Sequence, residues 1–130
     1  MGRVQNKVAL TTGAARGQGR SHAIRLAQEG ADIIALDICA DVATVPYPVA
    51  RPEDLEETLR LVEKEDRKIL ARQLGVRDLA GLTDVVALAM EEFRRIDVVV
   101  ANAGLSSMRP LLEQSETEWQ DMVDILLTGA

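Results

Sequence analysis

The stretch Thr12-Gly13-Ala14-Ala15-Arg16-Gly17-Gln18-Gly19 places three glycines between a short apolar run and a helix-forming segment of this 130-residue chain. The apolar run at 7–12 (KVALTT) predicts a buried strand. Residues 20–29 carry apolar side chains at helical spacing, and Gly30 then provides a helix C-cap. The sequence therefore predicts a strand, a glycine turn and a helix in succession.

Each glycine of this turn has a physical role if the turn holds a dinucleotide. Gly13 permits the tight turn, Gly17 lets the backbone approach a diphosphate, and Gly19 lets the helix pack closely on the strand. Backbone amides at the N-terminus of the helix then bind phosphate oxygens. The predicted cofactor contacts in the turn are Gly13, Ala15, Arg16, Gly17, Gln18 and Gly19.

An aspartate follows the second predicted strand, which lies at 31–36 (ADIIAL). Asp37 lies near the spacing of about 20 residues after the turn at which an acid accepts a hydrogen bond from the adenosine ribose. Its carboxylate repels a 2′-phosphate, so the pattern favours NAD, with Ile38 as a neighbouring contact. Arg16 favours NADP instead, because a guanidinium can pair with a 2′-phosphate. We give Asp37 more weight because residues 38–40 contain no basic side chain.

Short apolar runs alternate with helix-period stripes along the chain, which is typical of an α/β protein with a parallel sheet. We expect one Rossmann-type, doubly wound domain over 1–130, with about four strands in the order 3-2-1-4 and a ligand cleft beside the first strand. Such a sheet is an incomplete version of the full fold. The expected elements are strands at 7–12, 31–36, 68–74 and 97–101, and helices at 20–29, from Pro52, at 79–93 and after Ser115.

Two elements in the second half of the chain are expected to bury apolar side chains. The strand at 97–101 (DVVVA) is apolar enough to predict cover on both faces. With no further strand beside it, however, it forms a sheet edge, which promotes pairing between copies of the chain. The final helix begins at a capping box of Ser115 and Glu118. Its expected apolar stripe consists of Trp119, Met122, Val123 and Leu126.

Composition excludes several classes of partner. The net charge of −6 argues against binding to nucleic acid or to an anionic membrane surface. Cys39 is the single cysteine, so no intrachain disulfide can form. The N-terminus does not have the pattern of a signal peptide, and we expect a cytoplasmic protein without a bound metal.

A second motif, Asn102-Ala103-Gly104, follows the fourth predicted strand. Together with the T-G-x-x-x-G-x-G spacing of the glycine turn, it resembles the short-chain dehydrogenase/reductase family over about residues 7–130. The resemblance implies an NAD-dependent oxidoreductase that transfers hydride between a secondary alcohol or ketone and NAD. It places Asn102, Ala103 and Gly104 beside the cofactor, and we expect Val76 to be a further contact. A methyltransferase also uses a glycine-rich turn and a ribose acid, but it does not account for the N-A-G motif.

A finer resemblance involves residues 17–22 (GQGRSH) and 37–48 (DICADVATVPYP). They are similar to the mycofactocin-associated subgroup, often named carveol dehydrogenases, which has an insertion after the second strand. Here the implied insertion is about 38–66. The resemblance implies that NAD is held under this insertion without ready exchange. It also implies that electrons from a small-molecule alcohol substrate pass to a peptide-derived redox cofactor.

The chain departs from the family at the positions that carry the chemistry. The family uses a serine and a Tyr-x-x-x-Lys pair, but Tyr47 is the single tyrosine and Arg51 stands four residues after it. Leu126 stands where the resemblance implies a supporting asparagine, and Gly75 where it implies an aspartate that binds adenine. We therefore predict no catalytic residue within these 130 residues.

Three interpretations follow from these departures. The chain is the NAD-binding portion of an alcohol dehydrogenase, a non-catalytic NAD-binding module, or an inactive, truncated copy that holds no ligand. We favour the first interpretation, because both family motifs are present and in the expected order. A homo-oligomer is a possible assembly for all three.

Overall fold

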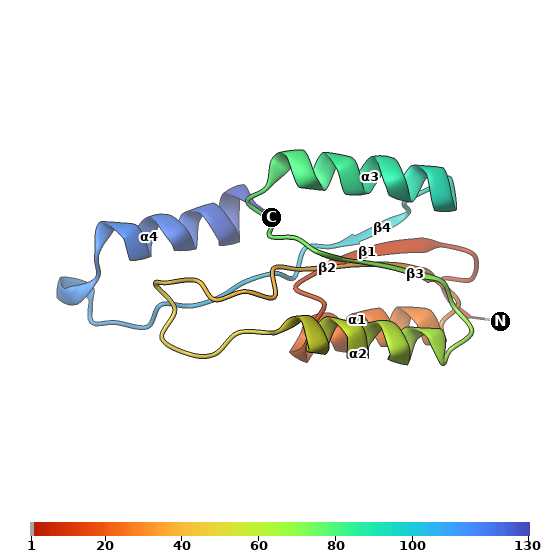
Figure 1. Cartoon of the computed structure of the whole chain (residues 1–130), viewed down its shortest axis with the longest axis horizontal. Helices are drawn as coiled ribbons and strands as arrows, with labels where there is room; N and C mark the ends of the chain where they lie inside the picture. Colours follow the sequence, from red (N-terminus) through yellow and green to blue (C-terminus); the bar gives the residue numbers. More distant parts are fainter. Residues whose placement is uncertain (1) are drawn as a thin grey trace.

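Four parallel strands form the centre of the molecule in the order β3-β2-β1-β4, as the sequence predicts (Figure 1). The computed structural model describes residues 2–130. Its strands are β1 (Val8–Thr12), β2 (Asp32–Asp37), β3 (Ile69–Gln73) and β4 (Val98–Val100). The predicted fold class, an α/β protein with a doubly wound parallel sheet, is confirmed.

Helices cover both faces of this sheet (Figure 1). The helices α1 (Gly17–Gln28) and α2 (Pro52–Glu63) lie on one face, and α3 (Leu79–Phe93) lies on the other. Successive residues of β2 point to opposite faces, so Ile33 packs in the cluster of α1 and α2 while Ile34 packs in the cluster of α3. Both side chains are fully buried, and each such burial contributes about 1.5–3 kcal/mol.

The first helix begins earlier than the sequence predicts. Apolar periodicity begins after Gly19, but α1 begins at Gly17 and Arg16 is its N-cap residue. The difference arises because the first turn of the helix faces the ends of the strands, where no apolar side chain is needed. The three residues of this turn, Gly17 to Gly19, therefore present helix N-terminal amides at the glycine turn.

The fourth strand is an edge strand, as the sequence predicts, but the predicted cover on both of its faces is wrong. β4 has three residues and is hydrogen-bonded to β1 alone. The side chain of Val99 is 65% exposed. Within residues 2–130 no strand pairs with the outer side of β4. Val98 packs against the cluster of α1 and α2, but Val99 on the other face remains exposed.

The final helix lies beyond the carboxyl ends of the strands, not over the sheet (Figure 1). A 3₁₀ turn, η1 (Leu111–Glu113), precedes α4 (Glu116–Val123), which continues into a π-helical turn, η2 (Asp124–Thr128). The predicted apolar stripe is only partly buried, because Trp119 is 61% exposed and Leu126 is 50% exposed, while Met122 and Val123 are half-buried. Glu118 and Ile125 are buried instead, since only one edge of the helix contacts the rest of the molecule. No helix within residues 2–130 is both long enough and apolar enough to span a membrane.

Candidate functional site

A cavity of about 450 Å³ lies at the carboxyl ends of the strands. Its volume falls within the range of small-molecule sites, and this edge is where open parallel sheets bind ligands. Most of the predicted cofactor contacts line it, namely Gly13, Arg16, Gly17, Gln18, Gly19, Asp37, Ile38, Val76, Asn102, Ala103 and Gly104. Ala15 is the remaining predicted contact, and it is fully buried behind the cavity wall.

The three glycines of the turn differ in what surrounds them. Gly13 has a φ of +64°, and a Cβ there would lie 2.9 Å from the Cα of Ala103. A Cβ at Gly19 would overlap the carbonyl oxygen of Gly13. Gly17 has a φ of +56°, but a Cβ there would meet no atom within 4 Å. Gly13 and Gly19 therefore permit close backbone packing, while Gly17 leaves the space beside the first turn of α1 open.

The first turn of α1 faces this space with unsatisfied donors. The N–H groups of Gly17, Gln18 and Gly19 have no intrahelical partner, because the first turn of any α-helix lacks the preceding carbonyls. Arg16 at the N-cap makes no side-chain hydrogen bond to them. The helix dipole adds a partial positive charge at this end. The arrangement can bind an anion such as a diphosphate.

Asp37 lies against the glycine turn. Its carboxylate is 8% exposed, and Oδ2 accepts a hydrogen bond of 3.0 Å from the backbone N–H of Ala15. Oδ1 accepts another of 3.0 Å from the N–H of Cys39. A carboxylate has about four acceptor sites, so each oxygen can accept one further hydrogen bond from a ligand hydroxyl. Ala15 thus contributes by orienting Asp37, not by lining the cavity.

Hydrogen bonds from the N-A-G motif connect the end of β4 to the glycine turn. The side-chain amide of Asn102 donates to the carbonyl oxygen of Thr12 at 2.9 Å and to that of Gly13 at 3.3 Å. The backbone N–H groups of Asn102 and Ala103 both donate to Oγ1 of Thr12, at 3.1 Å and 3.0 Å. Asn102 therefore sets the position of the turn from the neighbouring strand.

A second support for the glycine turn comes from Arg20 and Thr58, and the sequence alone does not predict it. Nε of Arg20 donates to Oγ1 of Thr58 at 3.0 Å, and Nη2 of Arg20 donates to the carbonyl oxygens of Ala15 and Asp54. The Thr58 hydroxyl donates to the carbonyl oxygen of Ala14 at 2.9 Å. Because α2 supplies Thr58 from far along the chain, spacing alone gives no signal for this contact.

The loop at 38–51, between β2 and α2, belongs to the implied insertion and lines the cavity. Beyond the predicted Ile38, it supplies Val42, Tyr47, Val49 and Ala50, which were not named as contacts from the sequence. The hydroxyl of Tyr47 accepts a hydrogen bond of 2.8 Å from the N–H of Ser106, just after the N-A-G motif. The guanidinium of Arg16 donates to the carbonyl oxygen of Pro48 at 2.9 Å. The loop is thereby connected to both the glycine turn and the segment after β4. The remaining part of the predicted insertion is α2 and the residues just after it, which connect β2 to β3.

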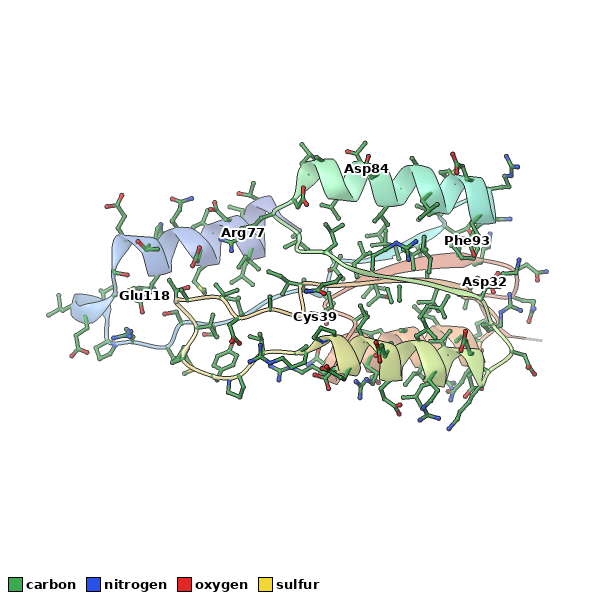
Figure 2. All side chains as sticks on the ribbon, viewed as in Figure 1. Asp32, Cys39, Arg77, Asp84, Phe93 and Glu118 are labelled. Atoms are coloured by element: carbon green, nitrogen blue, oxygen red, sulfur yellow. The ribbon has the colours of Figure 1, made fainter. Side chains whose placement is uncertain are left out.

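The same loop is held by α4. Oγ1 of Thr44 donates to Oδ2 of Asp121 at 2.6 Å, and Arg77 makes an ion pair of 2.6 Å with Oδ1 of Asp121. Figure 2 shows Arg77 against α4. The Thr44 hydrogen bond and then the Arg77 charge lower the pKa of Asp121 below its ordinary value. Asp121 therefore stays ionised at neutral pH. It connects α4 with the loop at 38–51 and with the segment after β3.

Two residues of chemically reactive types, Cys39 and His22, have no reactive setting. Burial, and then the charge of Asp37, raise the pKa of the Cys39 thiol to about 12, so it stays protonated at neutral pH. His22 is exposed on α1 and does not line the cavity. Within residues 2–130 no group of three or more His, Cys, Asp or Glu side chains is placed to hold a metal ion.

The position where an asparagine was expected lies at the cavity. Leu126 is a lining residue, and a Cβ at Gly104 would lie 3.0 Å from its Cδ2. Its side chain can neither donate nor accept a hydrogen bond. The cavity wall beside Gly104 is therefore apolar.

The parallel sheet, the glycine turn after β1 and the cavity together define a Rossmann-type α/β protein. The profile of the short chain dehydrogenases matches residues 7–130, so the chain belongs to the short-chain dehydrogenase family. This assignment excludes the methyltransferase alternative.

Several relatives resemble the chain closely. An NAD-dependent oxidoreductase of Mycobacterium tuberculosis is 54% identical over 129 residues, which are 98% of this chain and 47% of the relative. The crystal structure of carveol dehydrogenase from Mycobacterium avium in complex with NAD has 53% identity and a TM-score of 0.95, and covers 99% of this chain and 47% of that chain. A short chain dehydrogenase from Mycobacterium paratuberculosis bound to NAD has 45% identity and a TM-score of 0.96, with coverage of 98% and 48%. This chain thus spans about half the length of these relatives.

Proposed function

We propose that this chain binds NAD in the cavity and is the cofactor-binding part of an oxidoreductase. The observation that carries the proposal is the hydrogen bond between Asp37 and Ala15, which sets a ribose acceptor beside the open first turn of α1. A diphosphate on the amides of that turn leaves the adenosine ribose next to Asp37. The NAD complexes of two close structural relatives support the same assignment.

Each part of the site has a separate role in this proposal. NAD, when bound, supplies the nicotinamide ring that accepts or gives up hydride. The amides of Gly17 to Gly19 bind its diphosphate, and Asp37 accepts from a ribose hydroxyl. Asp37 also repels a 2′-phosphate, while the guanidinium of Arg16 is engaged by Pro48. The site is therefore expected to favour NAD over NADP.

Isothermal titration calorimetry with NAD and with NADP tests this proposal. We expect NAD to bind and NADP to bind at least about tenfold more weakly, equivalent to about 1.4 kcal/mol. Asp37→Asn should narrow that ratio, because the neutral amide no longer repels the 2′-phosphate. Asp41→Asn is the matched control, since Asp41 lies in the same loop, pairs with Arg51 and does not line the cavity. Absence of NAD binding by folded wild-type chain contradicts the proposal.

We further propose that the complete reaction is oxidation of a secondary alcohol by the NAD, and that these 130 residues do not perform it alone. Support comes from the lack of a Tyr-x-x-x-Lys pair in the sequence and from the apolar Leu126 at the cavity. Incubation of the chain with NAD and carveol should give no increase in NADH absorbance. Alcohol-dependent NADH formation contradicts this part of the proposal.

We also infer that the loop at 38–51 slows the exchange of NAD. Its support is the set of contacts from Tyr47 to Ser106 and from Thr44 to Asp121, which connect the loop across the cavity. NADH that stays bound must then be re-oxidised in place by a second reaction partner. In the related subgroup this partner is a peptide-derived redox cofactor. Thr44→Val should speed NAD release in a stopped-flow displacement assay, and an unchanged release rate contradicts this inference.

The exposed edge of β4 supports self-association of the chain. An unpaired strand edge can pair with a strand of another copy. Val99 is exposed on β4. We propose that a second copy of the chain covers this edge.

A further inference from the structure

The position of the adenine base follows from the strand order, and this step rests on the proposed function. The diphosphate lies after β1 and the ribose lies beside Asp37 at the end of β2, so the base extends toward the end of β3. Asp37 pairs with Gln73 in the sheet register. The N–H of Leu74 donates to the carbonyl oxygen of Asp37 at 2.7 Å. The segment from Leu74 to Val76 therefore lies alongside the ribose acceptor and forms the wall of the base subsite.

This wall has no side chain that can accept a hydrogen bond. Its lining residues are Ile38, Leu74, Gly75 and Val76. Gly75 contributes no side chain, and the Ile38 side chain covers it, because a Cβ at Gly75 would lie 3.2 Å from the Cδ1 of Ile38. The base is therefore in contact with aliphatic groups on this side.

The polar side chains nearest in sequence are engaged elsewhere. Oδ1 of Asp78 accepts from the N–H of Gly81 at 2.9 Å as the N-cap of α3, and Asp78 does not line the cavity. The side-chain amide of Gln73 donates to the carbonyl oxygen of Ile38 at 3.1 Å. Arg77 lines the cavity, but a guanidinium only donates, and it is paired with Asp121. None of these side chains is placed to accept from the 6-amino group of adenine.

We propose that the base subsite binds its purine by apolar contact without recognising the 6-amino group, and that Gly75 is the position that determines this. A dinucleotide that lacks the amino group should then bind as well as NAD. A carboxylate introduced at this position should make the site prefer NAD over a dinucleotide without the 6-amino group, because a hydrogen bond to a charged acceptor is stronger than one to a neutral acceptor. Gly75 is thus a specificity-determining residue for the cofactor.

The backbone at this position accepts a side chain. Gly75 does not have the positive φ that restricts substitution at Gly13 and Gly17. The atom nearest to a new Cβ is the end of the flexible Ile38 side chain, which can move by a few tenths of an ångström. Gly75→Asp and Gly75→Ala are therefore both expected to fold.

The test compares NAD with nicotinamide purine dinucleotide, which lacks the 6-amino group and retains N1 as an acceptor. Calorimetric titration of the wild-type chain should give dissociation constants that agree within about threefold, or about 0.7 kcal/mol. Gly75→Asp should favour NAD by about tenfold or more. Gly75→Ala, the matched control, should leave the ratio as in the wild type, since it adds bulk without an acceptor.

Each outcome distinguishes this proposal from the proposed function. A wild-type preference for NAD of about tenfold or more overturns the proposal for Gly75 while leaving NAD binding established. A folded Gly75→Asp chain that binds both dinucleotides equally also overturns it. If folded wild-type chain binds neither dinucleotide, the proposed function itself fails, and the inference fails with it.

Discussion

Two strands of the same sheet, β2 and β4, are both rich in branched aliphatic residues but differ in burial. Ile33 and Ile34 of β2 are fully buried, whereas Val99 of β4 is 65% exposed. β2 has a strand on each side and helices over both faces, while β4 is bonded to β1 alone. The burial of a strand therefore depends on its neighbours in the sheet and not on its own apolar sequence alone.

Two parts of the cavity wall also differ, in how closely their atoms pack. Around the glycine turn, backbone atoms of Gly13, Gly19 and Ala103 approach so closely that a Cβ has no room. Beside Gly104, by contrast, the wall is formed by the flexible side chain of Leu126, which is 50% exposed. The first wall is rigid and built from backbone, while the second can adapt.

The largest expected effect concerns the two strands. Ile33→Ala should lower the free energy of unfolding by about 2–5 kcal/mol, because it leaves a cavity in a packed cluster. Val99→Ala should change it by less than about 0.5 kcal/mol, because its side chain is mostly in solvent. Urea denaturation followed by circular dichroism measures both values. Equal losses of unfolding free energy for the two variants would contradict the difference in burial between β2 and β4.

The two parts of the cavity wall should differ less than the two strands in the unfolding free energy that an added methyl group costs. Gly19→Ala should lower the free energy of unfolding by about 1–3 kcal/mol, because a methyl group there overlaps the carbonyl oxygen of Gly13. Gly104→Ala should cost less than about 1 kcal/mol, since Leu126 can move aside. The same denaturation assay compares them, and a costlier Gly104→Ala would show that the second wall is the rigid one.

The exposed edge should control self-association. Val99→Lys should weaken the association of the chain by about tenfold, because a charge at a strand edge disfavours pairing. Leu79→Lys is the control, since Leu79 is 77% exposed and belongs to α3, not to β4. Sedimentation velocity over a range of concentrations reports the effect. Equal weakening by both substitutions would exclude β4 as the interface.

The smallest effect is expected at Asp97, where β4 begins. The hydrogen bonds from Arg95 and from the N–H of Val8 hold the pKa of Asp97 well below its ordinary value. The ionised carboxylate therefore stabilises the folded state above its ordinary pKa, and that contribution is lost as the pH falls through the lowered value. Asp97→Asn should make unfolding less dependent on pH below about 4. Asp84→Asn, at an exposed position of α3, should leave the acid profile unchanged, and identical profiles for both variants would contradict the prediction.

The local parts of the site could be predicted from sequence, and the long-range parts could not. The glycines at 13, 17 and 19 and the acid at the end of β2 follow from steric and electrostatic needs that act within a short segment. The contacts of Arg20 with Thr58 and of Tyr47 with Ser106 depend on how distant segments meet. The burial of β4 and α4 was misjudged for the same reason, because it depends on neighbours and not on periodicity.

The most direct test of the account follows the backbone amides of the glycine turn during NAD binding. In ¹H–¹⁵N spectra of the labelled chain, the signals of Gly17 and Gly19 should shift with saturation as NAD is added. ADP-ribose should reproduce these shifts, and the signal of Ala89, which is on α3 and does not line the cavity, should stay in place. Saturable NAD binding that leaves the Gly17 and Gly19 amides unperturbed would contradict the claim that this turn binds the diphosphate.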